Sequence, residues 1–199
     1  MSNIFSDPPF ARGRTLLGGD TIEVDDVGPV AGRQTVGTVK AFQDVTPTTG
    51  QRNSSRLVYC VAARYVGSSD MEGSVVAGRV FVFTDTATFN APTFAEFGAV
   101  AQNSDLTAVK NCGVLDEYLT VTIRKNDIVW LVVKGPTSVQ KADSTSIAAG
   151  ATVEMSSTTG KVVTQSSGVA IGQNIAGAAV ATAANTLIRI NKTCGNDFI

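Results

Sequence analysis

The sequence of 199 residues contains no histidine. Imidazole is the commonest general base and the commonest metal-binding side chain, so its absence removes both roles. A Ser-His-Asp triad is impossible. A zinc site would need Cys60, Cys112 and Cys194, which lie far apart in the chain and form no Cys-x-x-Cys pair. We therefore expect neither a metal centre nor a cofactor.

Charge is also scarce. Charged residues make up 17% of the chain, and 16 Lys and Arg against 17 Asp and Glu leave a net charge of -1. A chain so close to neutrality has no strong field to attract nucleic acid or an anionic membrane surface. Basic residues do not cluster with aromatic residues either, so no nucleic-acid partner is expected. The low charge and the 19 glycines leave two interpretations open: a surface repeatedly covered by other subunits, or a compact, weakly charged β fold.

Long apolar runs are missing. No segment approaches the roughly 20 apolar residues of a membrane span. Residues 1–14 are polar and contain Pro8 and Pro9, unlike the uninterrupted apolar stretch of a secretory signal. We expect a protein made in a cytoplasm, with no membrane partner and with its three cysteines reduced. Cys60 falls inside a strand pattern and is expected to be buried.

Sequence signatures of catalysis are absent as well. No GxGxxG segment lies between a strand and a helix, and Gly160 and Lys161 are followed by Val162 rather than by Ser or Thr. Adjacent carboxylates occur at residues 25–26 and at Asp116 and Glu117, but nothing places two of them across one cleft, as a glycosidase requires. The prediction is a protein that is not an enzyme and has no small-molecule substrate.

What the sequence does contain is a series of short strand patterns between turn-forming residues. They predict strands at residues 21–24, 36–42, 57–65, 75–83, 118–123, 128–134, 151–155, 161–164, 169–171 and 187–190. Residues 176–184, rich in alanine, are expected to be extended or irregular rather than helical. Many short strands without a convincing long helix predict an all-β fold, a compact β-sandwich or β-barrel.

The segment 128–134 carries apolar residues on both faces, which indicates a central strand with Trp130 in the core. Lys134, Gly135 and Pro136 are expected to end this strand at a rim. The turn at 124–127 predicts a hairpin between residues 118–123 and this central strand.

Residues 1–20 are predicted to be an extended N-terminal arm, followed by a single β-rich domain at 21–199. Pro8 and Pro9 exclude regular structure there, and Gly18 and Gly19 loosen the junction. The arm is either a disordered terminus or a segment that docks on another subunit. Its candidate contact residues are four apolar and two basic side chains: Phe5, Phe10, Leu16, Leu17, Arg12 and Arg14.

Several stretches together resemble the capsid cement, or decoration, proteins of tailed phages. These are GVLDEY at 113–118, NDIVWLVVKGPT at 126–137, GATV at 150–153, TTGKV at 158–162, LIRI at 187–190, and GTVKAFQDVTP at 37–47 before the strand at 56–65. The resemblance covers most of residues 35–190 and does not extend to the arm.

What this resemblance implies is structural. Such proteins are β-rich and typically homotrimeric, and they bind the major capsid protein on the outside of an expanded icosahedral shell, bracing it against packaged DNA. The expected location is therefore the virion surface, and there are no catalytic residues to carry over. The turn at 113–118 is then expected to present Asp116 and Glu117 to a neighbour. The alternative is a carbohydrate-binding or adhesin-like β module of a phage fibre or tail, which would expose aromatic side chains.

Overall fold

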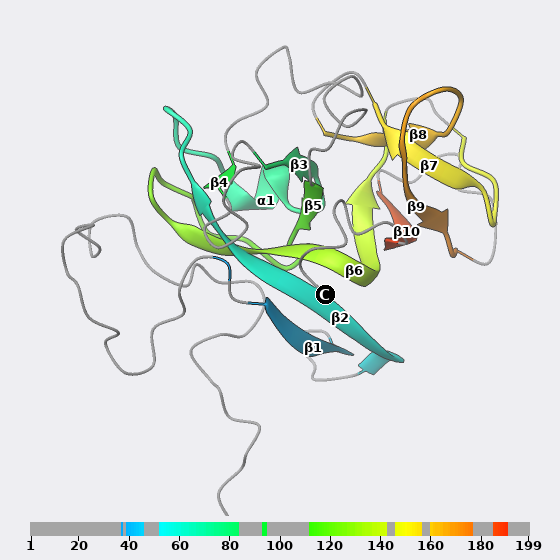
Figure 1. Ribbon diagram of the computed structural model, residues 1–199, viewed down its shortest axis with the longest axis horizontal. Coiled ribbons are helices and arrows are strands. Elements are labelled where there is room, and N and C mark those ends of the chain that lie inside the picture. The colour runs from blue at the N-terminus through cyan, green and yellow to red at the C-terminus, as the bar shows by residue number, and fades with distance from the viewer. Residues whose placement is uncertain are drawn as a thin grey trace, which may run out of the picture.

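The computed structural model describes residues 37, 39–45, 52–83, 93–94, 112–142, 146–156, 160–176 and 185–190. Within these ranges the protein is almost entirely β, as predicted, with one helix of four residues (Figure 1). The elements are β1 (Val39–Val45), β2 (Arg52–Tyr65), α1 (Gly73–Val76), β3 (Val80–Val82), β4 (Thr93–Phe94), β5 (Cys112–Leu115), β6 (Ile128–Gln140), β7 (Thr152–Met155), β8 (Val162–Thr164), β9 (Ala170–Asn174) and β10 (Asn185–Ile190).

The ten strands form one hydrogen-bonded network in the order β1-β2-β6-β10-β9-β7-β8. β5 adds to β6, β3 adds to β5, and the two-residue β4 pairs with the end of β2. All strand pairs are antiparallel except that of β2 with β4. The network therefore grows outward from β6 in both directions.

β6 belongs to two sheets. Its first part pairs with β2, from Arg64 opposite Ile128 to Tyr59 opposite Lys134, and its second part pairs with β10. Gly135 lies at the change of partner, with a φ of 105° in the left-handed region. The prediction that the strand stops at Lys134 is thus wrong: glycine lets the strand bend and continue to Gln140.

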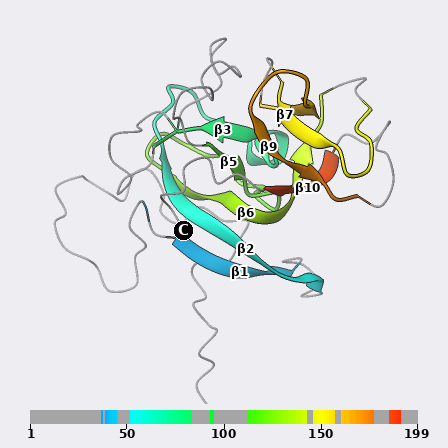
Figure 2. The ribbon, with the colours of Figure 1, turned by 45° about the vertical axis from the view of Figure 1, so that its right-hand side comes forward.

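The two sheets enclose a common apolar core. The first sheet contributes alternate residues of β2 and β6, such as Val58 and Trp130, and the second contributes residues such as Val153 and Ile188. The two sheets are also linked away from β6, where the Val80 amide donates to the Gly160 carbonyl, 2.8 Å away. The two sheets are therefore joined at two seams, by β6, which runs through both, and by this backbone hydrogen bond. Figure 2 shows β7, β9 and β10 set beside the sheet of β1, β2 and β6.

A second core covers the other face of the first sheet. Alternation along β2 and β6 sends Val61, Ala63, Val129 and Leu131 to this side, where residues of α1 and of the turns after β5 pack on them. Both faces of β6 are therefore buried over its first part, which confirms the predicted central strand. Trp130 is 1% exposed and is a core residue, as expected.

Two local predictions were wrong. Residues 118–123 form no strand, because there only Ile123 makes a single bridge, to Met71, so β6 has no hairpin partner from this segment. Residues 75–83 are not one strand either: α1 ends at Val76, a turn follows with Gly78 at a φ of 75°, and β3 begins at Val80.

Other strand predictions are confirmed with shifted ends, namely those that became β1, β2, β7, β8, β9 and β10. The predicted strand at 21–24, the arm at 1–20 and the alanine-rich segment from residue 177 onward lie outside the described residues. Cys60 is buried and forms no disulfide, as expected. Cys112 is disulfide-bonded, so the expectation of three reduced thiols is wrong for Cys112.

Candidate functional site

The turn after β5 separates the two adjacent carboxylates. Asp116 is 1% exposed. Its backbone amide donates to the Trp130 carbonyl at 3.2 Å, and its Oδ1 accepts from the Tyr118 amide at 3.2 Å. The Asp116 carboxylate thus shapes the turn, which is a usual role for aspartate. Glu117, by contrast, is half-buried and reaches the surface, so of the two it is the one that a partner can contact.

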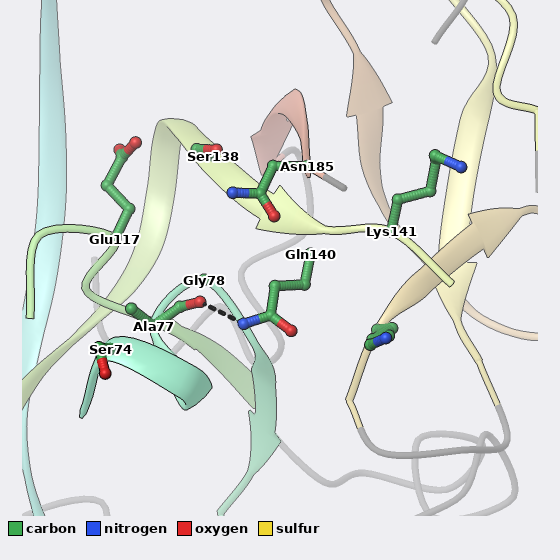
Figure 3. Close-up of a pocket in the computed structure, with 9 residues that line it drawn as sticks. Ser74, Ala77, Gly78, Glu117, Ser138, Gln140, Lys141 and Asn185 are labelled. Carbon is green, nitrogen blue, oxygen red and sulfur yellow. Dashed lines mark hydrogen bonds between the residues drawn. The ribbon is translucent and has the colours of Figure 1, made fainter. Parts of the chain in front are cut away.

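Glu117 lines an open polar hollow of about 470 Å³ at the meeting point of both sheets (Figure 3). Thr137 Oγ1 donates to Glu117 Oε1 over 3.4 Å and ties the turn to β6. The remaining lining residues come from α1 and the turn after it, from the second part of β6, and from the residues at the starts of β8 and β10: Ser74, Ala77, Gly78, Ser138, Gln140, Lys141, Lys161 and Asn185.

Gln140 holds one wall of this hollow in place. Its Nε2 donates to the carbonyls of Val75 at 2.7 Å and Ala77 at 2.8 Å, and its Oε1 accepts from Arg79 Nε at 3.1 Å. The Gln140 backbone amide also donates to the Gly78 carbonyl at 2.8 Å. One side chain therefore fixes α1 and its following turn against the end of β6, as the dashed line to Ala77 in Figure 3 shows in part.

The charges of the hollow are unevenly placed. In Figure 3 the Glu117 side chain stands on one side of Gln140 and Lys141 stands on the other. Lys141 is 4% exposed, and its Nζ donates to the Ala142 carbonyl at 3.4 Å. Lys161 adds a second cation to the lining. The hollow can therefore bind a polar surface through hydrogen bonds and charge.

The lining of the hollow is mainly polar. It carries two hydroxyls, two amides, one carboxylate and two ammonium groups. Across the described ranges, no three Cys, Asp or Glu side chains gather as a metal site would require. In the same ranges no helix is long and apolar enough to cross a bilayer.

The sequence pointed to only part of this site. Of the predicted contact residues, the structure places Asp116 inside and Glu117 at the hollow. Phe5, Phe10, Arg12, Arg14, Leu16 and Leu17 lie outside the described residues. Gln140, Lys141 and Lys161 were missed, because residues from separate strands carry no common local pattern.

Comparison with known proteins gives weak likenesses. No family model matches the chain, and no curated protein matches it. Among solved structures, the N base of the head fiber gp8.5 of bacteriophage phi29 aligns at a TM-score of 0.40 and 12% identity, over 67% of this chain and 96% of that one. A chain of the capsid of Myoviridae phage XM1 aligns at a TM-score of 0.46 and 17% identity, over 76% of this chain and 93% of that one. Neither likeness is strong enough to carry an argument about function.

Proposed function

We propose that this protein is a non-enzymatic capsid cement protein that binds the major capsid protein on the outer surface of an icosahedral phage shell. The observation that carries the proposal is where the cement-like stretches of the sequence fall. They lie on β1, β2, β5, β6, β7, β8 and β10, the strands that build both sheets. The resemblance therefore extends over strands of both sheets rather than over one recurrent motif.

The physical character of the scaffold supports this role. Both faces of β6 are buried in apolar clusters, and the two sheets are joined by hydrogen bonds at two seams. A rigid, weakly charged β body suits repeated close packing on a lattice. Many modest contacts repeated by symmetry add up to a large stabilisation of a shell. In this proposal the protein is a homotrimer, and the hollow around Glu117 is one of its contact surfaces.

The arm belongs to the same proposal. Its apolar residues Phe5, Phe10, Leu16 and Leu17 would anchor it on a neighbouring subunit, with Arg12 and Arg14 beside them. Removal of residues 1–19 should then leave the domain folded and weaken shell binding. Equal binding by the shortened and full-length chains would mean that the arm is only a chain terminus.

The carbohydrate-binding alternative finds less support. Sugar sites usually offer an exposed aromatic face, yet none of the residues that line the hollow is aromatic. Tyr65 is buried and its hydroxyl donates to the Ser69 carbonyl at 2.6 Å. Tyr59 and Tyr118 are half-buried.

The decisive experiment is the copy number of this protein per purified virion, measured by quantitative mass spectrometry against the major capsid protein. A cement protein gives hundreds of copies in a fixed ratio to the shell protein. A handful of copies would indicate a tail or fibre component and would revive the carbohydrate-binding alternative. Absence from the particles would overturn the proposal.

A further inference from the structure

β1 lies at an edge of the sheet. Among the described strands it pairs with β2 alone, and Figure 2 shows it as the outermost of the coloured strands on that side. The backbone N–H and C=O groups on the outer edge of such a strand can pair with another strand. This edge is therefore a place where a second chain could extend the sheet.

The pairing of β1 with β2 is regular over most of the strand. Its register with β2 is regular from Val39 to Gln43 and shifts before Val45, which lies opposite Arg52. At this shift β2 has four residues, 53–56, between its paired positions, whereas β1 has only Asp44. The irregularity thus falls on the strand that faces away from the open edge. No proline interrupts residues 39–45 either, although edge strands often carry one to prevent association.

Part of the apolar surface of β1 remains uncovered. Ala41 is exposed, and Val39 and Phe42 are half-buried. The Phe42 ring meets the Trp130 ring edge-on, with centroids 5.2 Å apart and an interplanar angle of 70°. Phe42 therefore lies between the core and the open edge, where a neighbouring strand would cover the rest of its ring.

The residues of β1 are self-complementary. The strand reads VKAFQDV, with Phe42 at its centre. When two such strands pair antiparallel about Phe42, Lys40 of each lies opposite Asp44 of the other. Val39 then lies opposite Val45, and Ala41 lies opposite Gln43. Opposite charges in directly facing positions stabilise an antiparallel pair, and like charges destabilise it.

We propose that β1 pairs antiparallel with β1 of a second copy of this chain, about a two-fold axis at Phe42. The charge pattern favours a second copy of the chain as the partner strand. In a two-fold contact residue i faces j while j faces i, so a strand with opposite charges at equal distances from its centre is complementary to itself. Each Lys40 then faces an Asp44, two such pairs form, and the first sheet continues from one copy into the next. The pairing does not require Lys40 to lack partners within its own chain.

The inference is independent of the proposed shell binding. It concerns two copies of the chain in solution and would hold for any function. If the protein is a homotrimer on a shell, the contact would join neighbouring trimers. The virion copy number can therefore contradict the proposed shell binding while the β1 contact is confirmed, and the reverse also holds.

Charge reversal tests the pairing. Lys40→Glu makes Glu face Asp44, and Asp44→Lys makes Lys face Lys40, each at two symmetry-related places. Each single change should raise the dissociation constant of the full-length protein roughly tenfold or more in sedimentation analysis, because attraction becomes repulsion twice. The double variant Lys40→Glu with Asp44→Lys restores opposite charges and should associate like the original chain. Lys125→Glu, in an exposed turn, is the matched control and should change nothing.

A crosslink identifies the register without altering charge. Ala41→Cys protein mixed with Gln43→Cys protein should give a disulfide-linked dimer on oxidation, while neither protein alone should, because position 41 faces position 43. Circular dichroism melting checks that each variant folds. The proposal is overturned if the unaltered chain shows no step of self-association, if the single reversals associate normally, or if the double variant stays as weak as they are. A dimer lost on removal of residues 1–19 but unaffected by charge reversal would instead indicate the arm as the occupant of the edge.

Discussion

Gly135 of β6 lies so close to Leu57 of β2 that a Cβ on Gly135 would stand 2.6 Å from the Leu57 carbonyl oxygen. The φ of 105° at Gly135 is also one that side chains rarely allow. Both constraints act at the point where β6 leaves the first sheet and enters the second. The glycine therefore sets the relation between the two sheets.

Gly135→Ala should lower the free energy of unfolding by about 2–4 kcal/mol, from left-handed strain plus a backbone clash that cannot relax by moving a side chain. Chemical unfolding followed by circular dichroism measures the change. Gly150→Ala is the matched control, since Gly150 has a φ of 75° but nothing within 4 Å of its added Cβ. It should cost only about 1–2 kcal/mol. Equal losses for the two variants would mean that contact with Leu57 does not shape the bend.

Trp130→Ala should lower the free energy of unfolding by about 3–5 kcal/mol, because the side chain is 1% exposed and fills the core shared by both sheets. Trp130→Phe should cost less than half as much. The indole Nε1 has no hydrogen-bond partner in the described part of the chain, so phenylalanine removes volume without breaking a bond. Because Trp130 is the single tryptophan, unfolding must be followed by circular dichroism rather than by fluorescence. A near-zero change for Trp130→Ala would contradict its place in the core.

The strands that the sequence predicted well are those whose apolar pattern has a local cause. β2 from Val58 onward and the first part of β6 are buried on both faces, so their apolar runs are visible in any window. The end of β6 was missed because Gly135 and Pro136 usually end strands. Here the approach of Leu57, which is distant in the sequence, makes a bend instead.

The failed hairpin has a similar explanation. Residues 118–123 alternate like a strand, yet Val121 is 42% exposed and only Ile123 bridges to Met71. β5 already pairs with β6 at Leu131 and Val132, on the edge opposite β2, so a hairpin partner would have to displace it. Segments that are distant in the sequence compete for such an edge, and a short window of sequence carries no information about that competition. The polar hollow could not be predicted for the same reason. Of its lining residues, only Glu117 was a predicted contact residue, because it lies beside Asp116 in the sequence.

Asn174→Ala should destabilise the second sheet by about 2–4 kcal/mol, because several buried groups lose their partner together. Asn174 Nδ2 donates to the Ala148 carbonyl at 2.9 Å, and its Oδ1 accepts from the Ala176 amide and from Thr186 Oγ1, each at 3.0 Å. Thermal unfolding by calorimetry measures the loss. Gln173→Ala, its exposed neighbour on β9, should cost no more than about 1 kcal/mol, although Gln173 Nε2 donates to the Gly150 carbonyl at 2.8 Å. If the two variants melt alike, the amide of Asn174 is not the link between β9, β10 and residue 148.

If the hollow is a shell contact, Glu117→Lys should weaken binding to shells that lack this protein roughly tenfold or more. The reason is that a partner surface complementary to the Glu117 carboxylate would then face a like charge. The change leaves the hollow with cations from three residues, Lys141 and Lys161 among them, and no carboxylate. The fold should survive, since Glu117 is half-buried and lies at an open hollow rather than in either apolar core. Asp70→Lys makes the same charge change at an exposed residue outside the hollow and should bind normally. Cosedimentation with shells measures both variants. Equal weakening would indicate a general charge effect, and normal binding by Glu117→Lys would remove the hollow from the contact surface.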